Sequence, residues 1–172
     1  MQSKILALDA FYNDANAHVI GVVFSDFGLN EIKWYNQDTV IAEEYIPGQF
    51  YKRELPCLLN ILNEVDLSEI DLIIIDGYVF LDDLGKKGLG AHLFDSIKQK
   101  VPIMGVAKSK FYNNTKTTLE VFRGKSKRPL YVSSIGIEIE RAADLLMNLV
   151  GNYRMPDILK KLDQITKGTT SL

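Results

Sequence analysis

Three short apolar segments of the chain each end in an ionisable residue. Asp9 follows Ile-Leu-Ala-Leu, Asp76 follows Leu-Ile-Ile-Ile, and Lys108 follows Ile-Met-Gly-Val-Ala. If these segments are parallel strands that lie side by side, their carboxyl ends form the crevice in which open α/β sheets usually bind ligands. Two carboxylates at one edge repel each other and shift their pKa values unless a cation such as Mg²⁺ neutralises them. We therefore expect a divalent metal at this edge.

Each of these residues has an ordinary explanation when taken alone, because an aspartate after a strand is more often a turn or capping residue than a metal ligand. The coincidence of three is the stronger signal. The sequence has two histidines, no clustered Cys/His zinc pattern, no Walker loop and no Gly-x-Ser-x-Gly elbow. A site with hard oxygen ligands is the kind that remains.

The hydrophobic pattern predicts the elements that must position these residues. Strands are expected at residues 4–9, 17–24, 31–41, 71–76, 101–107 and 130–133. Helices are expected at residues 53–65, 89–98, 138–149 and 156–165, the last with Pro156 in its first turn. The first three strands form an antiparallel meander in this scheme. The order predicts an α/β fold, a mixed sheet of a three-strand meander plus parallel strands, flanked by helices.

Composition limits the class of protein. The chain has 172 residues, 47% of them hydrophobic, so we expect a single domain over residues 1–172. Cys57 lies in an apolar stretch and is expected to be a core residue in a reducing compartment. No segment has the length of a membrane span or the form of a signal peptide. We expect a soluble, cytoplasmic monomer with no membrane partner.

Charge is distributed unevenly along the chain. The net charge is −2, yet residues 108–128 carry a local balance of +6 and the remainder carries −8. The positive residues are Lys108, Lys110, Lys116, Arg123, Lys125, Lys127 and Arg128. This stretch is either a phosphate-facing patch or a solvated loop and strand edge, and the sequence leaves both open.

One segment makes the functional prediction much sharper. Residues 45–54 read Tyr-Ile-Pro-Gly-Gln-Phe-Tyr-Lys-Arg-Glu, which resembles the Tyr-x-Pro-Gly, then Arg-Glu, motif of the endonuclease V family. Other landmarks of that family follow in order. They are Asp9-x-x-Tyr12, Asp76-Gly77, Gly88-x-x-x-His92, Gly105-Val-Ala-Lys-Ser109, Pro129-Leu-Tyr-Val-Ser133 and Tyr153-Arg-Met-Pro-Asp157 with Asp163 beyond it. The resemblance covers nearly the whole chain.

The resemblance implies an RNase H-like fold and a nuclease that uses Mg²⁺ or Mn²⁺ to cut DNA or RNA near a deaminated base, usually inosine, in DNA repair or RNA processing. Asp9 and Asp76 would then be metal ligands, and Glu54 a third carboxylate at the metal or its water. Asp163 would be a ligand or would orient water, and Lys108 would stabilise charge at the scissile phosphate. One metal ion or two are compatible with this set.

The family resemblance also implies a substrate surface. Tyr45, Ile46, Pro47 and Gly48 match the wedge that enters a duplex beside the lesion, where a flat ring and a rigid proline replace lost stacking. A base pocket would form near Gly48, Gly77, Gly88 and Gly105, where ordinary turn geometry is the alternative explanation. The complete set expected to bind substrate is Tyr12, Tyr45, Pro47, Gly48, Arg53, Gly77, Gly88, Leu89, His92 and Gly105.

The chain departs from the family in several places. After Asp76-Gly77 the family has Gln-Gly and a His-Pro-Arg element, whereas residues 78–87 here read Tyr-Val-Phe-Leu-Asp-Asp-Leu-Gly-Lys-Lys. Asp82 or Asp83 is a candidate electrostatic substitute for the missing histidine. The chain also begins almost at the first expected strand, as in a divergent, N-terminally short member.

Three hypotheses follow. The first is a Mg²⁺-dependent endonuclease acting on deaminated DNA or RNA. The second is a non-catalytic or weakly active nucleic-acid-binding protein on the same fold, because the His-Pro-Arg element is missing and the basic stretch is kept. The third is an enzyme that handles small-molecule phosphates with the same metal chemistry.

Overall fold

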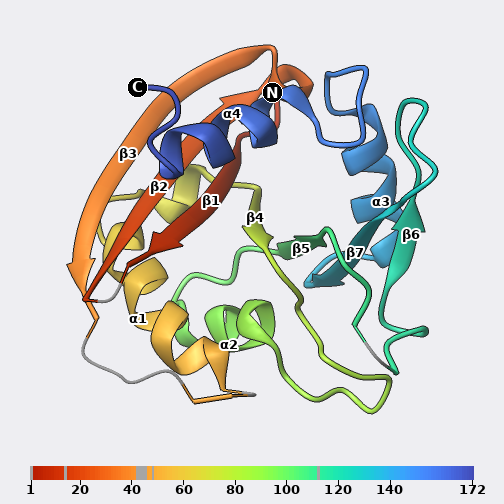
Figure 1. Cartoon of the computed structure of the whole chain (residues 1–172), viewed down its shortest axis with the longest axis horizontal. Coiled ribbons are helices and arrows are strands. Elements are labelled where there is room, and N and C mark those ends of the chain that lie inside the picture. The colour runs from red at the N-terminus through yellow and green to blue at the C-terminus, as the bar shows by residue number, and fades with distance from the viewer. Residues whose placement is uncertain (1, 14, 42–45, 48, 112) are drawn as a thin grey trace.

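The computed structural model describes residues 2–13, 15–41, 46–47, 49–111 and 113–172, and the side chain of Phe50 is not among the described features. One seven-stranded mixed sheet has the order β3-β2-β1-β4-β5-β7-β6 (Figure 1). Its strands are β1 (Ile5–Tyr12), β2 (Asn16–Ser25), β3 (Asn30–Val40), β4 (Leu72–Asp76), β5 (Ile103–Ala107), β6 (Leu119–Val121) and β7 (Leu130–Ile135). Its helices are α1 (Phe50–Leu62), α2 (Leu89–Ser96), α3 (Ile139–Asn148) and α4 (Asp157–Thr166), with short 3₁₀ turns at Asp26–Gly28 and Leu67–Glu69.

The first half of the sheet is the predicted antiparallel meander. β1 pairs with β2 and β2 with β3, both antiparallel, with a register shift between Val23 and Phe24. The turn before β2 is held by the Asn13 side chain, whose Oδ1 accepts a hydrogen bond from the Asn16 amide at 2.9 Å. This is the hydrogen bonding through which asparagine favours turns.

The centre of the sheet is parallel. β1 pairs with β4 and β4 with β5, and these strands are apolar on both faces because helices cover both. The parallel pairing of β1 with β4 ends at Leu8 and Ile75, while β1 continues along β2 as far as Tyr12. Asp9 therefore lies inside β1, directly after the last residue of β1 that pairs with β4.

Helices form a layer on each side of the sheet. Residues of α1 and α2 share one buried cluster with one face of β1, β2, β4 and β5, and Cys57 is a core residue there, as predicted. Residues of α3 and α4 share a second cluster with the opposite face. Figure 1 shows α4 lying across β1 and β2, and α3 beside β7 and β6. None of the described helices is long and apolar enough to cross a membrane.

The structure shifts several predicted bounds, and the strand expected to end at Asp9 continues to Tyr12. Three further differences concern β6, β7 and α4. β6 was not predicted, because three residues that include the exposed Glu120 are too few to show an alternating pattern. β7 extends two residues beyond Ser133 and runs antiparallel to β5. Pro156 caps α4 rather than lying in its first turn, since the helix begins at Asp157.

Candidate active site

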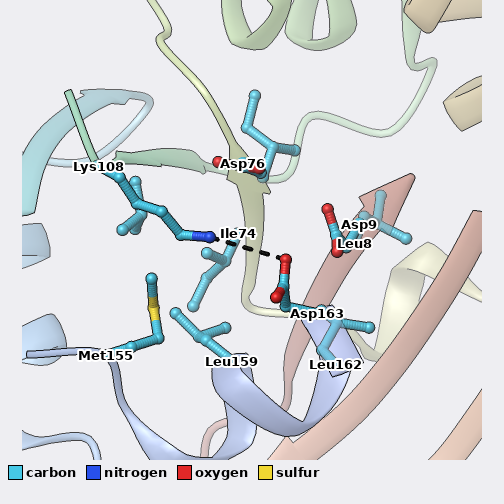
Figure 2. Close-up of a pocket in the computed structure, with 11 residues that line it drawn as sticks. Leu8, Asp9, Ile74, Asp76, Lys108, Met155, Leu159, Leu162 and Asp163 are labelled. Atoms are coloured by element: carbon cyan, nitrogen blue, oxygen red, sulfur yellow. Dashed lines mark ion pairs between the residues drawn. The ribbon is translucent and has the colours of Figure 1, made fainter. Parts of the chain in front are cut away.

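The two-residue period of the strands brings three of the predicted site residues to one face. Asp9, Asp76 and Lys108 each stand an even number of positions after core residues that pack under α3 and α4. Those core residues are Ile5 and Ala7, Leu72 and Ile74, and Met104 and Val106. Helix α4 supplies Asp163 from above this face. Figure 2 shows the three aspartates and Lys108 around one small pocket.

Glu54 approaches the same edge from the other layer. It lies on α1, and with Asp9, Asp76, Tyr12 and Leu89 it lines a second small cavity. The Tyr12 hydroxyl hydrogen-bonds the Glu54 carboxylate and so favours its charged form. Asp9 and Asp76 line both cavities, so they stand at the centre of the cluster. Each cavity has about 40 Å³, which is room for a few water molecules.

Burial and mutual repulsion make these carboxylates hard to ionise. Burial first, and then Asp76, raises the pKa of Asp9 to about 6. The same two causes raise the pKa of Glu54 to about 7. Asp76 is accessible at the rim, yet the protein around its carboxylate raises its pKa despite the opposing charge of Lys108. A cluster of acids held in this state is stabilised by any cation that enters it.

Lysines neutralise the fourth acid. Lys108 Nζ lies 3.7 Å from Asp163 Oδ1, and Lys167, one helical turn after Asp163, lies 2.8 Å from the same oxygen. The first of these pairs is the dashed line in Figure 2. Thr166, which the sequence did not single out, is buried close to the Asp9 carboxylate, and its hydroxyl donates to the Leu162 carbonyl at 2.6 Å. Thr166 follows Asp163 by three residues on α4, so helical periodicity places the two on one face, but only the docking of α4 on β1 brings that face to Asp9.

The family model described as Endonuclease V matches residues 2–164. The chain belongs to the endonuclease V family. A curated Endonuclease V of Pyrococcus abyssi is 30% identical to it over 173 residues, which cover 99% of this chain and 82% of that protein.

Solved structures show the same fold. The Endonuclease V of Bacillus subtilis matches with a TM-score of 0.78 and 16% identity, over 98% of this chain and 80% of that one. The Endonuclease V of Ciona intestinalis, solved with a 24mer DNA containing an inosine followed by a ribo-adenosine, matches with a TM-score of 0.77 and 17% identity, over 98% and 85%. The expected RNase H-like mixed sheet of the endonuclease V family is thereby confirmed.

The substrate residues expected from the endonuclease V motifs are spread around the α1–α2 side of this edge. Arg53 lies over the Tyr12 ring at 4.8 Å and donates to the Asn13 carbonyl at 3.4 Å. The His92 ring stacks on Tyr51, with centroids 3.7 Å apart. The sequence had not singled out Tyr51.

The wedge motif is only partly visible. Pro47 lies in an exposed turn just before α1, in which the Gln49 amide donates to the Ile46 carbonyl at 3.0 Å. Tyr45 and Gly48 lie outside the described residues. Their assignment to the wedge stays a prediction.

Two of the predicted pocket glycines have a structural requirement of their own. A Cβ at Gly105 would stand 2.4 Å from the Gly77 carbonyl oxygen, and a Cβ at Gly88 would stand 2.6 Å from the Tyr78 carbonyl oxygen. Their lack of a side chain is therefore already explained by close packing of the chain on itself. Gly77 is different, because its φ is +131° and open space surrounds the position of a Cβ. Contact of any of them with a base stays a prediction.

The 78–87 loop, where the chain departs from the endonuclease V pattern, uses its acids for its own structure. Asp83 accepts hydrogen bonds from the Thr115 and Lys116 amides at 2.7 and 2.6 Å and from the Thr115 hydroxyl at 2.8 Å. Asp82 accepts from the Leu84 and Lys86 amides, each at 2.9 Å. Asp82 stabilises a local turn and Asp83 fixes the loop to residues 115 and 116. That either acid substitutes electrostatically for the missing histidine stays a prediction.

The residues of the basic stretch at 108–128 differ in their exposure to solvent. Arg123 is buried, with 3% of its surface exposed, so at this position it is neither phosphate-facing nor solvated, and both alternatives that the sequence left open are wrong. Its guanidinium donates to main-chain carbonyls of residues 149–154 instead. The neighbouring Lys125, Lys127 and Arg128 are exposed.

The residues at the edge suit a hard divalent cation. Their donors are carboxylate oxygens with raised pKa values, gathered around cavities large enough for an ion with its water. Within the part of the chain that the structure describes, no three Asp, Glu, His or Cys side chains are already spaced to hold a metal. Asp163 is paired with lysines instead. Asp9, Asp76 and Glu54 are thus the side chains that could hold an ion, with Asp163 joining them if its lysines turn away.

Proposed function

We propose that this chain is a Mg²⁺-dependent endonuclease that cleaves a phosphodiester near a deaminated base such as inosine, in DNA or RNA. The observation that carries the proposal is the cluster of Asp9, Asp76 and Glu54. These acids have raised pKa values at the carboxyl edge of the parallel strands, in a chain of the endonuclease V family. Three crowded acids repel one another unless a cation binds among them, so their clustering favours a metal site.

Each side chain has a defined task in this reaction. Asp9, Asp76 and Glu54 would hold the ion, which supplies positive charge at the phosphate and lowers the pKa of a water molecule; Mn²⁺ could replace Mg²⁺. Tyr12 holds the Glu54 carboxylate in place. Lys108, which is 45% exposed, can leave Asp163 and move to the phosphate as negative charge develops there. Asp163, once both Lys108 and Lys167 turn away, can orient water or complete the ligand set.

Base recognition would occur on the α1–α2 side. Pro47 lies in the exposed turn before α1, and Leu89 lines the cavity beside Glu54. His92 stacks on Tyr51, and Gly77 has open space where a Cβ would stand. Aromatic faces and open backbone are what an unstacked base requires, and extrusion costs least at a mispaired base. The Ciona Endonuclease V complex with inosine-containing DNA supports this choice of substrate.

Incubation of the full chain with end-labelled DNA and RNA strands, each containing either inosine or guanosine at one position, tests the proposal. Cleavage beside inosine should require Mg²⁺ or Mn²⁺ and should be lost in Asp76→Asn. The proposal fails if neither polymer is cut and the wild type behaves like the variant.

The 78–87 loop favours a second candidate, a protein of this fold that binds nucleic acid without cutting it. Its two aspartates are committed to turns, and nothing in it supplies the imidazole of the family pattern. Salt-dependent binding that is insensitive to chelation, with no product at any metal concentration, would select this alternative.

A further inference from the structure

A groove of about 560 Å³ lies next to the carboxylate edge, on the side away from α1 and α2. Its lining residues are Lys125, Ser126, Arg128, Asn152, Tyr153 and Arg154. Three of the six are basic, and of the described residues that line it none is acidic. Tyr153 is 69% exposed, and Lys160 on α4 stands over its ring at 5.6 Å. The groove thus combines positive charge with an exposed aromatic face.

A buried arginine fixes the two walls of this groove. The guanidinium of Arg123 donates to the carbonyls of Tyr153 at 2.8 Å and of Arg154 and Gly151 at 3.3 Å, and also to that of Leu149. Gly124 permits this close approach, because a Cβ there would stand 2.3 Å from the Asn152 carbonyl oxygen. The turn that carries Lys125 and Arg128 is therefore held against the 149–154 segment before any ligand arrives.

A second arginine joins the groove to the candidate active site. Arg154 donates to the Pro129 carbonyl at 2.6 Å and to the main-chain carbonyl of Lys108, the residue that follows β5. The next residue, Met155, lines the pocket that contains Asp9, Asp76 and Asp163. The groove and the carboxylate edge are consecutive parts of one surface.

We propose that this groove binds the nucleic-acid strand that runs away from the scissile phosphate on the side opposite the base pocket. Lys125 and Arg128 would contact successive phosphates, and Tyr153 would stack on a base. Basic side chains that track a backbone, interleaved with an aromatic platform, are the usual means of holding a single strand without reading its sequence. The inference rests on the proposed function for its substrate, but it concerns binding and not cleavage.

The test compares the double variant K125A/R128A with K33A/K98A, which removes two exposed lysines that do not line the groove and changes the net charge equally. Binding of inosine-containing single strands is measured by fluorescence anisotropy with the metal chelated, so that cleavage does not interfere. The slope of log Kd against log salt should fall by about 1.4 in the groove variant, since each lost phosphate contact on a single strand contributes about 0.7. The control variant should keep the slope of the wild type. Y153L should weaken binding roughly tenfold through lost stacking.

Strand length gives the second readout. Two series of strands are shortened stepwise on either side of the inosine. In the series shortened on the side that occupies the groove, the affinity of the wild type should fall to that of K125A/R128A. The affinity of K125A/R128A should stay constant over the same series. The inference is overturned if the groove variant matches K33A/K98A, or if it loses the same factor on strands of every length. If the protein cleaves inosine strands but gives either of these results, the proposed function stands and only the proposed role of the groove is overturned.

Discussion

Asp9 and Asp76, which lie where the parallel pairing of β1 with β4 ends, have the same type of side chain as the aspartates of the 78–87 loop but different surroundings. Asp83 accepts three hydrogen bonds from residues 115 and 116, and these lower its pKa. Asp9 is surrounded by protein and faces Asp76, and its pKa rises. A carboxylate that serves the fold is stabilised in its charged form by the fold, whereas Asp9 and Asp76 are left to be stabilised by something that binds. Four predictions test this distinction.

The largest effect is expected for Asp76→Asn. Because a bound cation supplies several kcal/mol of stabilisation to the transition state, loss of this ligand should reduce the cleavage rate on the order of 10³-fold. The matched control is Asp83→Asn, which should keep the rate within a few fold at low temperature. Single-turnover cleavage of an inosine strand measures both. Equal losses in the two variants would contradict the distinction between the two groups of acids.

The second prediction concerns metal binding without substrate. Mg²⁺ at 100 times its dissociation constant should stabilise the wild type by about 2.7 kcal/mol, because it binds only the folded chain. Thermal unfolding with and without Mg²⁺ measures the shift. Asp9→Asn and Asp76→Asn should abolish most of it, and Asp83→Asn should retain it. A shift that survives both strand-edge substitutions would place the ion elsewhere.

The third prediction concerns pH in the absence of metal. An acid whose pKa is higher in the folded chain than in the unfolded chain binds protons more tightly when folded. The free energy of unfolding therefore falls as pH rises from the pKa of the unfolded chain to that of the folded chain. For Asp9 this window runs from 3.8 to about 6. Asp9→Asn should therefore gain stability relative to the wild type as pH rises through the window. Chemical denaturation at several pH values checks this, and a constant difference between the two proteins would refute it.

The smallest effect is expected for the loop. Hydrogen bonds from Lys116 and Thr115 lower the pKa of Asp83 below its value of 3.8 in the unfolded chain. The contribution of Asp83 to stability is therefore present above pH 3.8 and is lost as the pH falls through the lower pKa of the folded chain. Asp83→Asn should lower the melting temperature slightly at neutral pH and not at all in strong acid. An identical deficit at both pH values would mean that the hydrogen bonds do not depend on the charge.

The sequence predicted the strand-edge residues because their signal is local. An apolar run followed by a charged residue, repeated in strands that prove to be parallel neighbours, fixes Asp9, Asp76 and Lys108 on one face through the two-residue period alone. Asp163 needed the family resemblance, since nothing in α4 itself says that this helix lies over β1. Thr166 was missed for the same reason.

The parts that were wrong depend on contacts between distant segments. Arg123 looks like its basic neighbours in the sequence, yet its guanidinium donates hydrogen bonds to main-chain carbonyls that lie 26 and 30 positions away. The hydrogen bonds of Asp83 to residues 115 and 116 are likewise invisible to periodicity. Local pattern identifies which residues face one another across a sheet, but not which charges are already satisfied.

The position of α4 also determines when the chain becomes competent. Asp9 emerges from the ribosome in the first strand, whereas Asp163, Thr166 and Lys167 emerge only with the last helix, which docks on β1 and β2. At roughly 5–20 residues per second, many seconds separate the two ends of the site. A nascent chain from which α4 has not yet emerged therefore lacks the complete acid cluster, and a protein proposed to cut nucleic acid does not acquire that ability before this helix docks.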